Sequence, residues 1–310
     1  MEIESIPLNQ ATSFSRIISD YLANDEKLEF SHHGLPSIDS LLKAADGRVF
    51  GSSSRRILAG ALRRQYEGIQ NLGITLQSID ALENEDTFTV TTGHQLCLFS
   101  GPLFSILKIV SAINLCHQLA QEQPNKTFVP VFWMASEDHD LEEANHVYLR
   151  GDKMSWNAGQ VGAVGRMNAL GVSELVSQLK DSFSPDFVSK IEKLLASYQA
   201  DNIAVSSRHF FHELFAKHGL VILDGDDEEL KRMFIPTMLD EVENSLAKTH
   251  VGSHNERLVS LGYKPQVNAP SCFLFRLEEG LRVRLDRVAR GFQLADGTRK
   301  WSREELKSDI

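Results

Sequence analysis

Two short runs rich in β-branched and aromatic residues flank a long apolar run. The first spans Phe88 to Thr92 and the second spans Phe128 to Met134, whereas apolar residues recur at helical spacing from Pro102 to about Gln121. Strand, helix and strand in this order are typical of a βαβ unit. The pattern therefore predicts an α/β fold with a parallel sheet, and ligands are expected at the carboxyl ends of its strands.

The residues before this unit have only helical patterns. Apolar residues recur every three or four positions from Ser13 to Leu22 and again from Ser53 to Tyr66. We expect residues 1–85 to form a helical N-terminal extension packed on the core. Residues 86–265 are then expected to form the α/β core with an insertion.

The rest of the predicted core continues the alternation of helices and strands. In order, the pattern predicts a strand at Val147–Leu149, a helical run from Val172 to Ala200, a helix at Ser207–Lys217, a strand at Leu220–Leu223 and a helix from about Asp227 to Ala247. The glycines between residues 151 and 171 are predicted to form turns, because no G-x-G-x-x-G motif follows a strand there.

Residues 266–310 change to an alternating pattern. Leu281 to Asp286 alternates strictly, Glu279-Gly280 and Asp296-Gly297 supply turns, and Gly291 to Leu294 predicts another strand. We therefore expect an antiparallel meander. Ser302-Arg-Glu-Glu305 is a capping box, which predicts the start of a helix that the chain interrupts at Ile310.

Composition and charge exclude several classes of protein. The 310 residues carry a formal net charge of −10, which argues against nucleic acid as the main partner. The three cysteines, Cys97, Cys116 and Cys272, have no paired spacing, so neither a disulfide framework nor a zinc knuckle is expected. No leader and no apolar run of about 18 residues is evident, so we expect a cytoplasmic protein without a membrane span.

The loop from Thr92 to Gly101 has the features of an anion site. Gly93 permits a sharp turn after the strand, His94 and Gln95 follow, and Gly101-Pro102 opens a helix. Free N–H groups at the start of a helix bind phosphate or carboxylate. An ordinary loop remains the alternative. Lys108, on the polar stripe of the helix, is either a cation for the ligand or a solvated lysine.

The second strand is followed by a dense group of ionisable residues. Glu137, Asp138, His139 and Asp140 are consecutive, and Asn145 and His146 follow shortly afterwards. Such a group can bind a metal, hold a substrate amine or act as general acid and base. Helix capping explains Glu142 and Glu143 but does not require four consecutive ionisable residues. We therefore predict a site here, with these four residues as catalytic candidates.

Two other groups are weaker candidates. His209, His212 and Glu213 have the order H-x-x-H-E, which does not place two histidines and a base as a zinc peptidase does, so we expect a helix with its histidines toward the edge of the buried face. Carboxylates from Asp224 to Glu229 suit the first turn of a helix. Asp224 alone, at the end of a strand, is retained as a candidate.

Taken together, these segments resemble the family of bacillithiol biosynthesis cysteine-adding enzymes, BshC. The resemblance rests on Thr92-Gly-His-Gln, Ser100-Gly-Pro-Leu-Phe with Lys108, Pro130-Val-Phe-Trp-Met-Ala-Ser-Glu-Asp-His-Asp and Asn145-His-Val. Weaker similarity covers Val161-Gly-Ala-Val-Gly-Arg-Met, Leu220-Val-Ile-Leu-Asp and Gly262-Tyr-Lys-Pro-Gln-Val. These segments occur in one order over nearly the whole chain.

The resemblance implies a Rossmann-like core related to class I aminoacyl-tRNA synthetases. It also implies a ligase that joins the carboxyl group of cysteine to the amine of glucosaminyl-malate, with ATP as the expected activator and Mg²⁺ as the nucleotide's counter-ion. Thr92, Gly93, His94, Gln95, Ser100, Gly101, Lys108 and Asn145 would then bind nucleotide or substrate, and no residue is assigned to a protein-held metal.

Members of the family continue beyond the length of this chain, so we expect the N-terminal part only, without the coiled-coil domain that makes the family dimeric. Activity of this chain alone is therefore doubtful. Two alternatives stay open at this point. One is a metal-dependent hydrolase using the Glu137-Asp138-His139-Asp140 group and His146, and the other is a non-catalytic nucleotide or metabolite binder.

Overall fold

The computed structural model describes residue 6 and residues 14–268, 270–278 and 280–310. The chain divides into two compact units, which are described separately. The sheet unit comprises Phe50–Pro236 and Phe275–Arg284, and the terminal unit comprises Met1–Val49, Thr237–Leu274 and Leu285–Ile310. The predicted domain boundaries after residues 85 and 265 stay predictions. Ser13 and Glu279, which the sequence assigns to a helix and a turn, lie outside the described residues.

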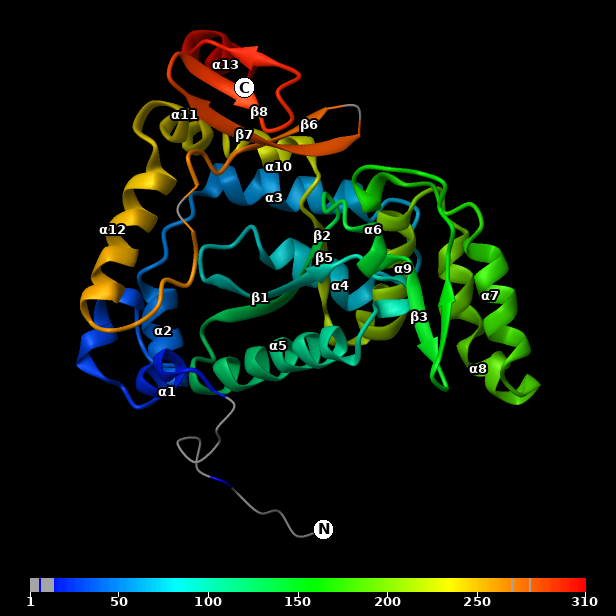
Figure 1. Ribbon diagram of the computed structural model, residues 1–310. Helices are drawn as coiled ribbons and strands as arrows, with labels where there is room; N and C mark the ends of the chain where they lie inside the picture. Colours follow the sequence, from blue (N-terminus) through cyan, green and yellow to red (C-terminus); the bar gives the residue numbers. More distant parts are fainter. Residues whose placement is uncertain (1–5, 7–13, 269, 279) are drawn as a thin grey trace. The chain divides into compact units, whose positions relative to one another are not determined.

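A three-stranded parallel sheet forms the centre of the sheet unit (Figure 1). Its order is β1 (Thr87–Gln95), β2 (Thr127–Ala135) and β5 (Val221–Asp224), and α5 (Leu103–Glu122) connects the first two strands. The predicted βαβ unit is therefore confirmed. Gly93 pairs with Trp133 and Met134 with Asp224, so all three strands end at the same edge of the sheet.

Helices cover this sheet because β2 and β5 carry buried apolar residues on both faces. α3 (Ser52–Gln65), α4 (Gly73–Ala81) and α9 (Ile203–Phe215) pack around β5, and α5 packs on β1 and β2. Ala59, Leu62, Ile109, Phe132 and Ile222 are completely buried between these elements. Tyr66, which caps α3, accepts a hydrogen bond from the backbone N–H of Ile222 at 2.8 Å and so fixes the helix to the edge strand β5.

A buried arginine joins α3 to the segment that leads into the sheet. The guanidinium group of Arg55 donates to the backbone carbonyls of Phe50, Leu82, Glu85 and Thr87 at 3.0 to 3.1 Å. The residue is 7% exposed. A cation that satisfies four carbonyl groups inside the protein keeps the start of β1 in place.

Several short elements follow β2, and the insertion predicted within the core stays a prediction. These elements are α6 (Leu141–Ala144), the hairpin of β3 (His146–Leu149) and β4 (Asp152–Ser155), η4 (Val164–Arg166), α7 (Val172–Asp181), α8 (Pro185–Ala196) and η5 (Ser197–Gln199). The predicted strand at Val147–Leu149 is confirmed. The prediction of one helical run from Val172 to Ala200 is wrong, because α7 ends at Asp181 and a new helix starts at Pro185 with Ser184 as its N-cap.

The predicted helix from Asp227 to Ala247 is also wrong. It consists of α10 (Glu228–Arg232), α11 (Ile235–Asn244) and the start of α12 (Leu246–Ser260). Pro236 lies in the first turn of α11, where a helix tolerates proline, and cannot lie in the middle of a regular helix. Ser245 has a left-handed backbone with φ of 53°, which separates α11 from α12.

The predicted C-terminal meander is confirmed. β6 (Phe275–Glu278), β7 (Leu281–Val288), β8 (Gly291–Leu294) and the short strand β9 (Lys300–Trp301) pair in this order as antiparallel neighbours. β9 was not predicted. The capping box at Ser302 and Glu305 is formed and begins α13 (Arg303–Asp309).

The terminal unit also contains α1 (Arg16–Leu22), η2 (Glu26–Ser31) and α2 (Ile38–Asp46), with a small core around Leu28, Leu258 and Tyr263. Glu241 of α11 is completely buried. Its carboxylate accepts hydrogen bonds from the backbone N–H groups of Ala247 at 2.9 Å and Phe273 at 3.3 Å. These bonds satisfy a charge that would otherwise be costly to bury.

Among the residues that the structure describes, one helix has the length and composition of a possible membrane span. α5 passes this test by length and mean composition, although Lys108 and several polar residues interrupt its apolar run. A core helix passes the same test, and α5 packs on β1 and β2. The finding is weak support for a span.

Candidate active site at the carboxyl edge of the sheet

The end of β1 comes unusually close to β2. A Cβ atom added to Gly93 would lie 2.9 Å from the carbonyl oxygen of Trp133 and 3.2 Å from its Cβ, so only glycine fits here without a shift. The ammonium group of Lys108 donates to the carbonyl of Gly93 at 2.5 Å. In this structure Lys108 therefore holds the end of the strand, and Thr92 lies half-buried beside Phe132.

The loop that follows has a strained backbone. Phe99, Ser100 and Gly101 have successive positive φ values of 52°, 74° and 64°. The hydroxyl group of Tyr198 accepts a hydrogen bond from the backbone N–H of Phe99 at 2.8 Å, and the two rings are 4.6 Å apart. Non-glycine residues keep such a conformation only where the surroundings impose it, and this is common at functional sites.

Removing the Tyr198 hydroxyl group tests this support. Tyr198→Phe leaves the stacked ring in place but deprives the N–H of Phe99 of its acceptor. We expect the free energy of unfolding in urea to fall by about 1 to 2 kcal/mol, the cost of a buried unsatisfied donor. Tyr148→Phe, at an exposed tyrosine, is the control. An equally small change in both variants would contradict the role of the bond.

The start of α5 faces this loop without a protein cap. Pro102 is the N-cap residue, no side chain caps the helix, and its first turn contains no acidic residue. The free N–H groups and the helix dipole therefore remain available for an anion. This geometry fits the phosphate or carboxylate site predicted from Gly101-Pro102.

The acidic group after β2 does not converge on one point. Asp138 accepts a hydrogen bond from the side-chain amide of Gln95 at 3.1 Å, whereas Glu137 forms an ion pair with Lys231 at 2.5 Å. Asp140 is the N-cap of α6 and accepts from the N–H of Glu143, and His139 is exposed. The four residues thus face different partners. Of the four, only Asp138 contacts the loop from Thr92 to Gly101, which we call the anion loop.

Asp138 is held as a carboxylate. Partial burial raises its pKa, but hydrogen bonds from the backbone of Asp140 and the side chain of Gln95, together with the nearby cation of Arg282, lower the pKa below its ordinary value. The side chain therefore accepts hydrogen bonds at neutral pH and is unsuited to act as a general acid there.

A cavity of about 750 Å³ lies between the anion loop and the β3 hairpin. Of the predicted residues, His94, Gln95 and Gly101 line it, together with His146. Sequence reasoning missed its other lining residues, which are Cys97, Phe99, Pro102, Glu143, Val147, Tyr148, Leu149 and Leu179. Ser100 lies in the adjoining loop and Asn145 precedes β3, where its side chain contacts His146 at 3.3 Å.

A network of ion pairs lies near the carboxyl ends of β2 and β5. Asp226 contacts both Arg166 and Lys231, and Lys231 also contacts Glu137. Asp224, the weaker candidate at the end of β5, accepts hydrogen bonds from Ser136 and from the backbone of Asp226. Its second oxygen lies 3.7 Å from the buried guanidinium group of Arg208. The residues of this network come from separate elements. Of its contacts, the sequence indicated only that carboxylates would follow β5.

Asp226 gives this network a pH dependence. Burial raises the pKa of Asp226, but hydrogen bonds from Arg166 and Lys231 outweigh it, so the pKa is lower in the folded than in the unfolded chain. The resulting stability is present above the unfolded pKa of about 4 and is lost as pH falls through the folded value. Asp226→Asn is expected to lower the free energy of unfolding by about 1 to 2 kcal/mol at pH 7.

Urea unfolding across pH checks this prediction. The difference between the wild-type chain and Asp226→Asn should stay constant from pH 7 to about 5 and shrink below about 4. The exposed Asp152→Asn variant serves as the control for an aspartate-to-asparagine change. A difference that persists at the lowest pH at which both chains fold would refute the electrostatic origin.

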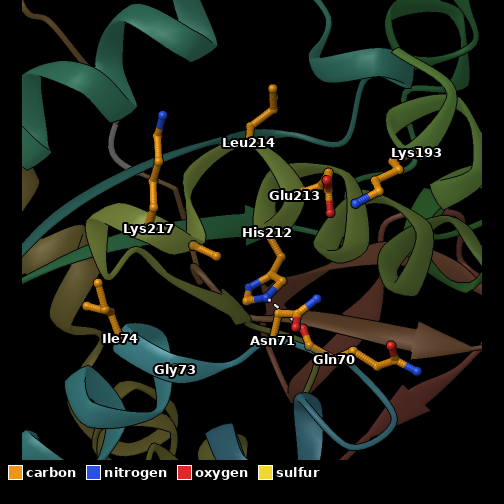
Figure 2. A pocket seen from close by; sticks show the side chains of 10 residues that line it. Gln70, Asn71, Gly73, Ile74, Lys193, His212, Glu213, Leu214 and Lys217 are labelled. Carbon is orange, nitrogen blue, oxygen red and sulfur yellow. Dashed lines mark hydrogen bonds between the residues drawn. The ribbon is translucent and has the colours of Figure 1, made fainter. Parts of the chain in front are cut away.

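A second cavity, of about 440 Å³, lies between α9 and the start of α4 (Figure 2). His212 is 5% exposed, so the expectation that both histidines lie toward the edge of the buried face is wrong for this residue. Its Nε2 lies 3.2 Å from the carbonyl oxygen of Gln70, as the dashed line in Figure 2 shows. Burial lowers the pKa of His212, so the ring is a neutral donor that fixes the loop before α4.

Among the described residues, no three histidine, cysteine, aspartate or glutamate side chains form a group that could hold a metal ion. Glu137, Asp138, His139 and Asp140 face different partners, as described above. The arrangement therefore offers no support for the alternative of a metal-dependent hydrolase built on these residues.

The sheet and its covering helices define a Rossmann-like α/β domain with a cavity at the carboxyl end of β1. The family model for bacillithiol biosynthesis BshC, N-terminal Rossmann-like domain, matches residues 1–310. The chain belongs to this family.

Relatives named "Putative cysteine ligase BshC" match along the same length. The protein of Cytophaga hutchinsonii is 36% identical over 309 residues, which cover 99% of this chain and 58% of the relative. The protein of Flavobacterium psychrophilum is 39% identical over 92% of this chain and 54% of the relative. The protein of Bacillus cereus strain AH187 is 26% identical over all of this chain and 59% of the relative. The chain thus spans somewhat more than half the length of these relatives.

Proposed function

We propose that this chain supplies the Rossmann-like part of a ligase that joins the carboxyl group of cysteine to the free amine of glucosaminyl-malate, the last step of bacillithiol synthesis. Membership of the family and the names of the relatives support this proposal. The structural observation that carries it is the hydrogen bond between Gln95 and Asp138. This bond joins the predicted anion loop to the predicted amine-binding segment at the edge of one cavity.

An amide does not form from a free carboxylate at a useful rate, so the reaction requires activation. ATP, when bound, supplies it, with Mg²⁺ as the counter-ion of the phosphates. The residues fit a nucleotide phosphate at the uncapped start of α5, beside the turn of Gly93 and the loop of Ser100 and Gly101. A relationship of the core to class I aminoacyl-tRNA synthetases belongs to the same proposal.

The acidic side of the site suits the amines of the substrates. Glu137 and Asp138 are carboxylates with partial exposure, and both accept hydrogen bonds or ion pairs from cationic or amide donors in the structure. A substrate ammonium group presents the same kind of donor. His139, exposed beside them, is available to accept a proton from the attacking amine.

The remaining parts of the proposal concern the whole protein. We infer that the additional length of the relatives completes the site and forms the coiled coil of a homodimer, and that the enzyme works in the cytoplasm. The substrates are then two small molecules and ATP, without a nucleic acid or membrane partner.

The experiment uses the full-length protein that contains this chain. It is incubated with cysteine, glucosaminyl-malate, ATP and Mg²⁺, and mass spectrometry follows the amide product and the nucleotide. Product formation coupled to ATP consumption is expected. Product without nucleotide consumption would refute the activation step, and no product under any condition would refute the ligase. Binding of ATP and cysteine without turnover would favour the non-catalytic binder.

A further inference from the structure

The ammonium group of Lys231 bridges two carboxylates at the carboxyl edge of the sheet. Its Nζ lies 2.5 Å from Oε1 of Glu137 and also contacts Oδ1 of Asp226. Asp226 receives a second cation, because Arg166 donates to both of its oxygens. Glu137, which the sequence places among the candidates for a substrate amine, is therefore already paired with an amine of the protein itself.

The two carboxylates differ in how strongly they are held. The side chain of Asp226 is 9% exposed and has two cations, whereas that of Glu137 is 36% exposed and is paired with Lys231. Solvent, and therefore a small ligand, reaches Glu137 more easily. If Lys231 leaves Glu137, it keeps Asp226 as a partner, so no buried charge is left unpaired by the change.

The lysine is also able to move. It extends from the short helix α10 on a flexible four-carbon stem, and its side chain is 31% exposed. Partly exposed ion pairs contribute little stability, because water competes for both charges. Exchanging one ammonium group for another on Glu137 therefore costs little.

We propose that Lys231 occupies the ammonium site of Glu137 in the free protein and that a primary-amine substrate displaces it, while Lys231 remains on Asp226. The identification of this site as the substrate site rests on the proposed function; the exchange itself does not require catalysis. Lys231 then sets the affinity for the amine, because every ligand must compete with it. A primary ammonium group fits since it supplies N–H donors in the same way as lysine, whereas a quaternary ammonium group supplies none.

Binding of cysteamine to the chain, with its cysteine thiols kept reduced, tests the exchange. Calorimetric titration compares the wild-type chain with Lys231→Met, in which the competitor is absent, and with Lys231→Arg, in which a cation remains. We expect cysteamine to bind Lys231→Met about three- to fivefold more tightly than the wild type. Its affinity for Lys231→Arg should equal its affinity for the wild type. The gain should vanish in the Glu137→Gln/Lys231→Met double variant. Equal or weaker binding by Lys231→Met would overturn the proposal.

Two controls separate the exchange from other effects. Lys217→Met removes an exposed lysine that lines the second cavity, where Figure 2 shows its side chain, and should leave cysteamine affinity unchanged. Thiocholine, the trimethyl counterpart of cysteamine, should not gain affinity in Lys231→Met. Equal gains for both ligands would attribute the effect to net charge and refute the exchange.

A measurement on the wild-type chain covers the case in which Lys231→Met does not fold. With isotope-labelled lysine, the side-chain resonance of Lys231 is identified by its absence in Lys231→Arg. Cysteamine should shift it, and tetramethylammonium at the same concentration should not. An unmoved resonance at saturating cysteamine would overturn the proposal. A shift in a protein that makes no amide would retain the exchange and refute only the ligase.

Discussion

Replacing Arg55 by methionine is expected to lower the free energy of unfolding by about 3 to 5 kcal/mol, the largest stability effect that we predict for the sheet unit. The guanidinium group satisfies four backbone carbonyls around the start of β1. Methionine fills a similar volume but donates no hydrogen bond, so buried carbonyls lose their partner. An unsatisfied buried polar group costs about 1 to 3 kcal/mol, and solvent rescues some of these groups.

Urea denaturation followed by circular dichroism measures this effect. Arg56→Met is the matched control, because Arg56 is the next residue of α3 and is exposed. The control is expected to change the free energy of unfolding by less than about 0.5 kcal/mol. Similar values for the two variants would show that Arg55 is not a structural cation. An unchanged midpoint of urea denaturation in Arg55→Met would also show that Arg55 is not a structural cation.

The elements with a strong local pattern could be predicted from the sequence. The alternation of β1, the helical period of α5 and the capping box of α13 each lie within a few neighbouring residues, and the structure forms all three. Local backbone preferences and burial point to the same answer in these segments. The parallel sheet followed from them, because strand, helix and strand leave few arrangements.

The helix boundaries were harder to predict because the apolar period continues across the breaks. Amphipathic spacing extends from α7 into α8, and it outweighs the helix-start signal of Ser184-Pro185 at the junction. Ser245 carries no signal of this kind. Its left-handed backbone depends on how α11 and α12 pack, which single-residue preferences do not encode.

The partners within the site could not be predicted because they are brought together only by the fold. The sequence grouped Glu137 with Asp138, yet these neighbours face Lys231 and Gln95 respectively. Consecutive residues point in different directions wherever a strand ends in a turn. The sequence therefore indicated which edge of the sheet carries the candidate site. Which partner each of its residues contacts follows only from the three-dimensional structure.

If this chain is part of the proposed ligase, replacing Gly101 by alanine is expected to reduce amide formation by that ligase by about 100-fold. Gly101 has φ of 64° and ψ of −139°, a combination that side chains rarely adopt, and an added Cβ would overlap with Cβ of Cys97. The backbone must therefore shift where the loop meets α5 and lines the cavity. A misplacement of about 1 Å at a positioning element costs about 100-fold in rate.

Gly159→Ala is the matched control, because Gly159 has a similar φ of 60° but nothing within 4 Å of an added Cβ. Both variants acquire an alanine at positive φ, which should cost each about 1 to 2 kcal/mol of stability, and Gly101→Ala also has the overlap with Cys97. Only Gly101→Ala should lose activity. Rates are compared at saturating cysteine and ATP, with thermal unfolding measured in parallel. The comparison separates the cost of a positive φ, which both variants share, from the shift of the backbone at the cavity, which only Gly101→Ala requires. Full activity in a folded Gly101→Ala enzyme would place the reaction outside this cavity. An equal loss of activity in both variants would attribute the effect to lower stability.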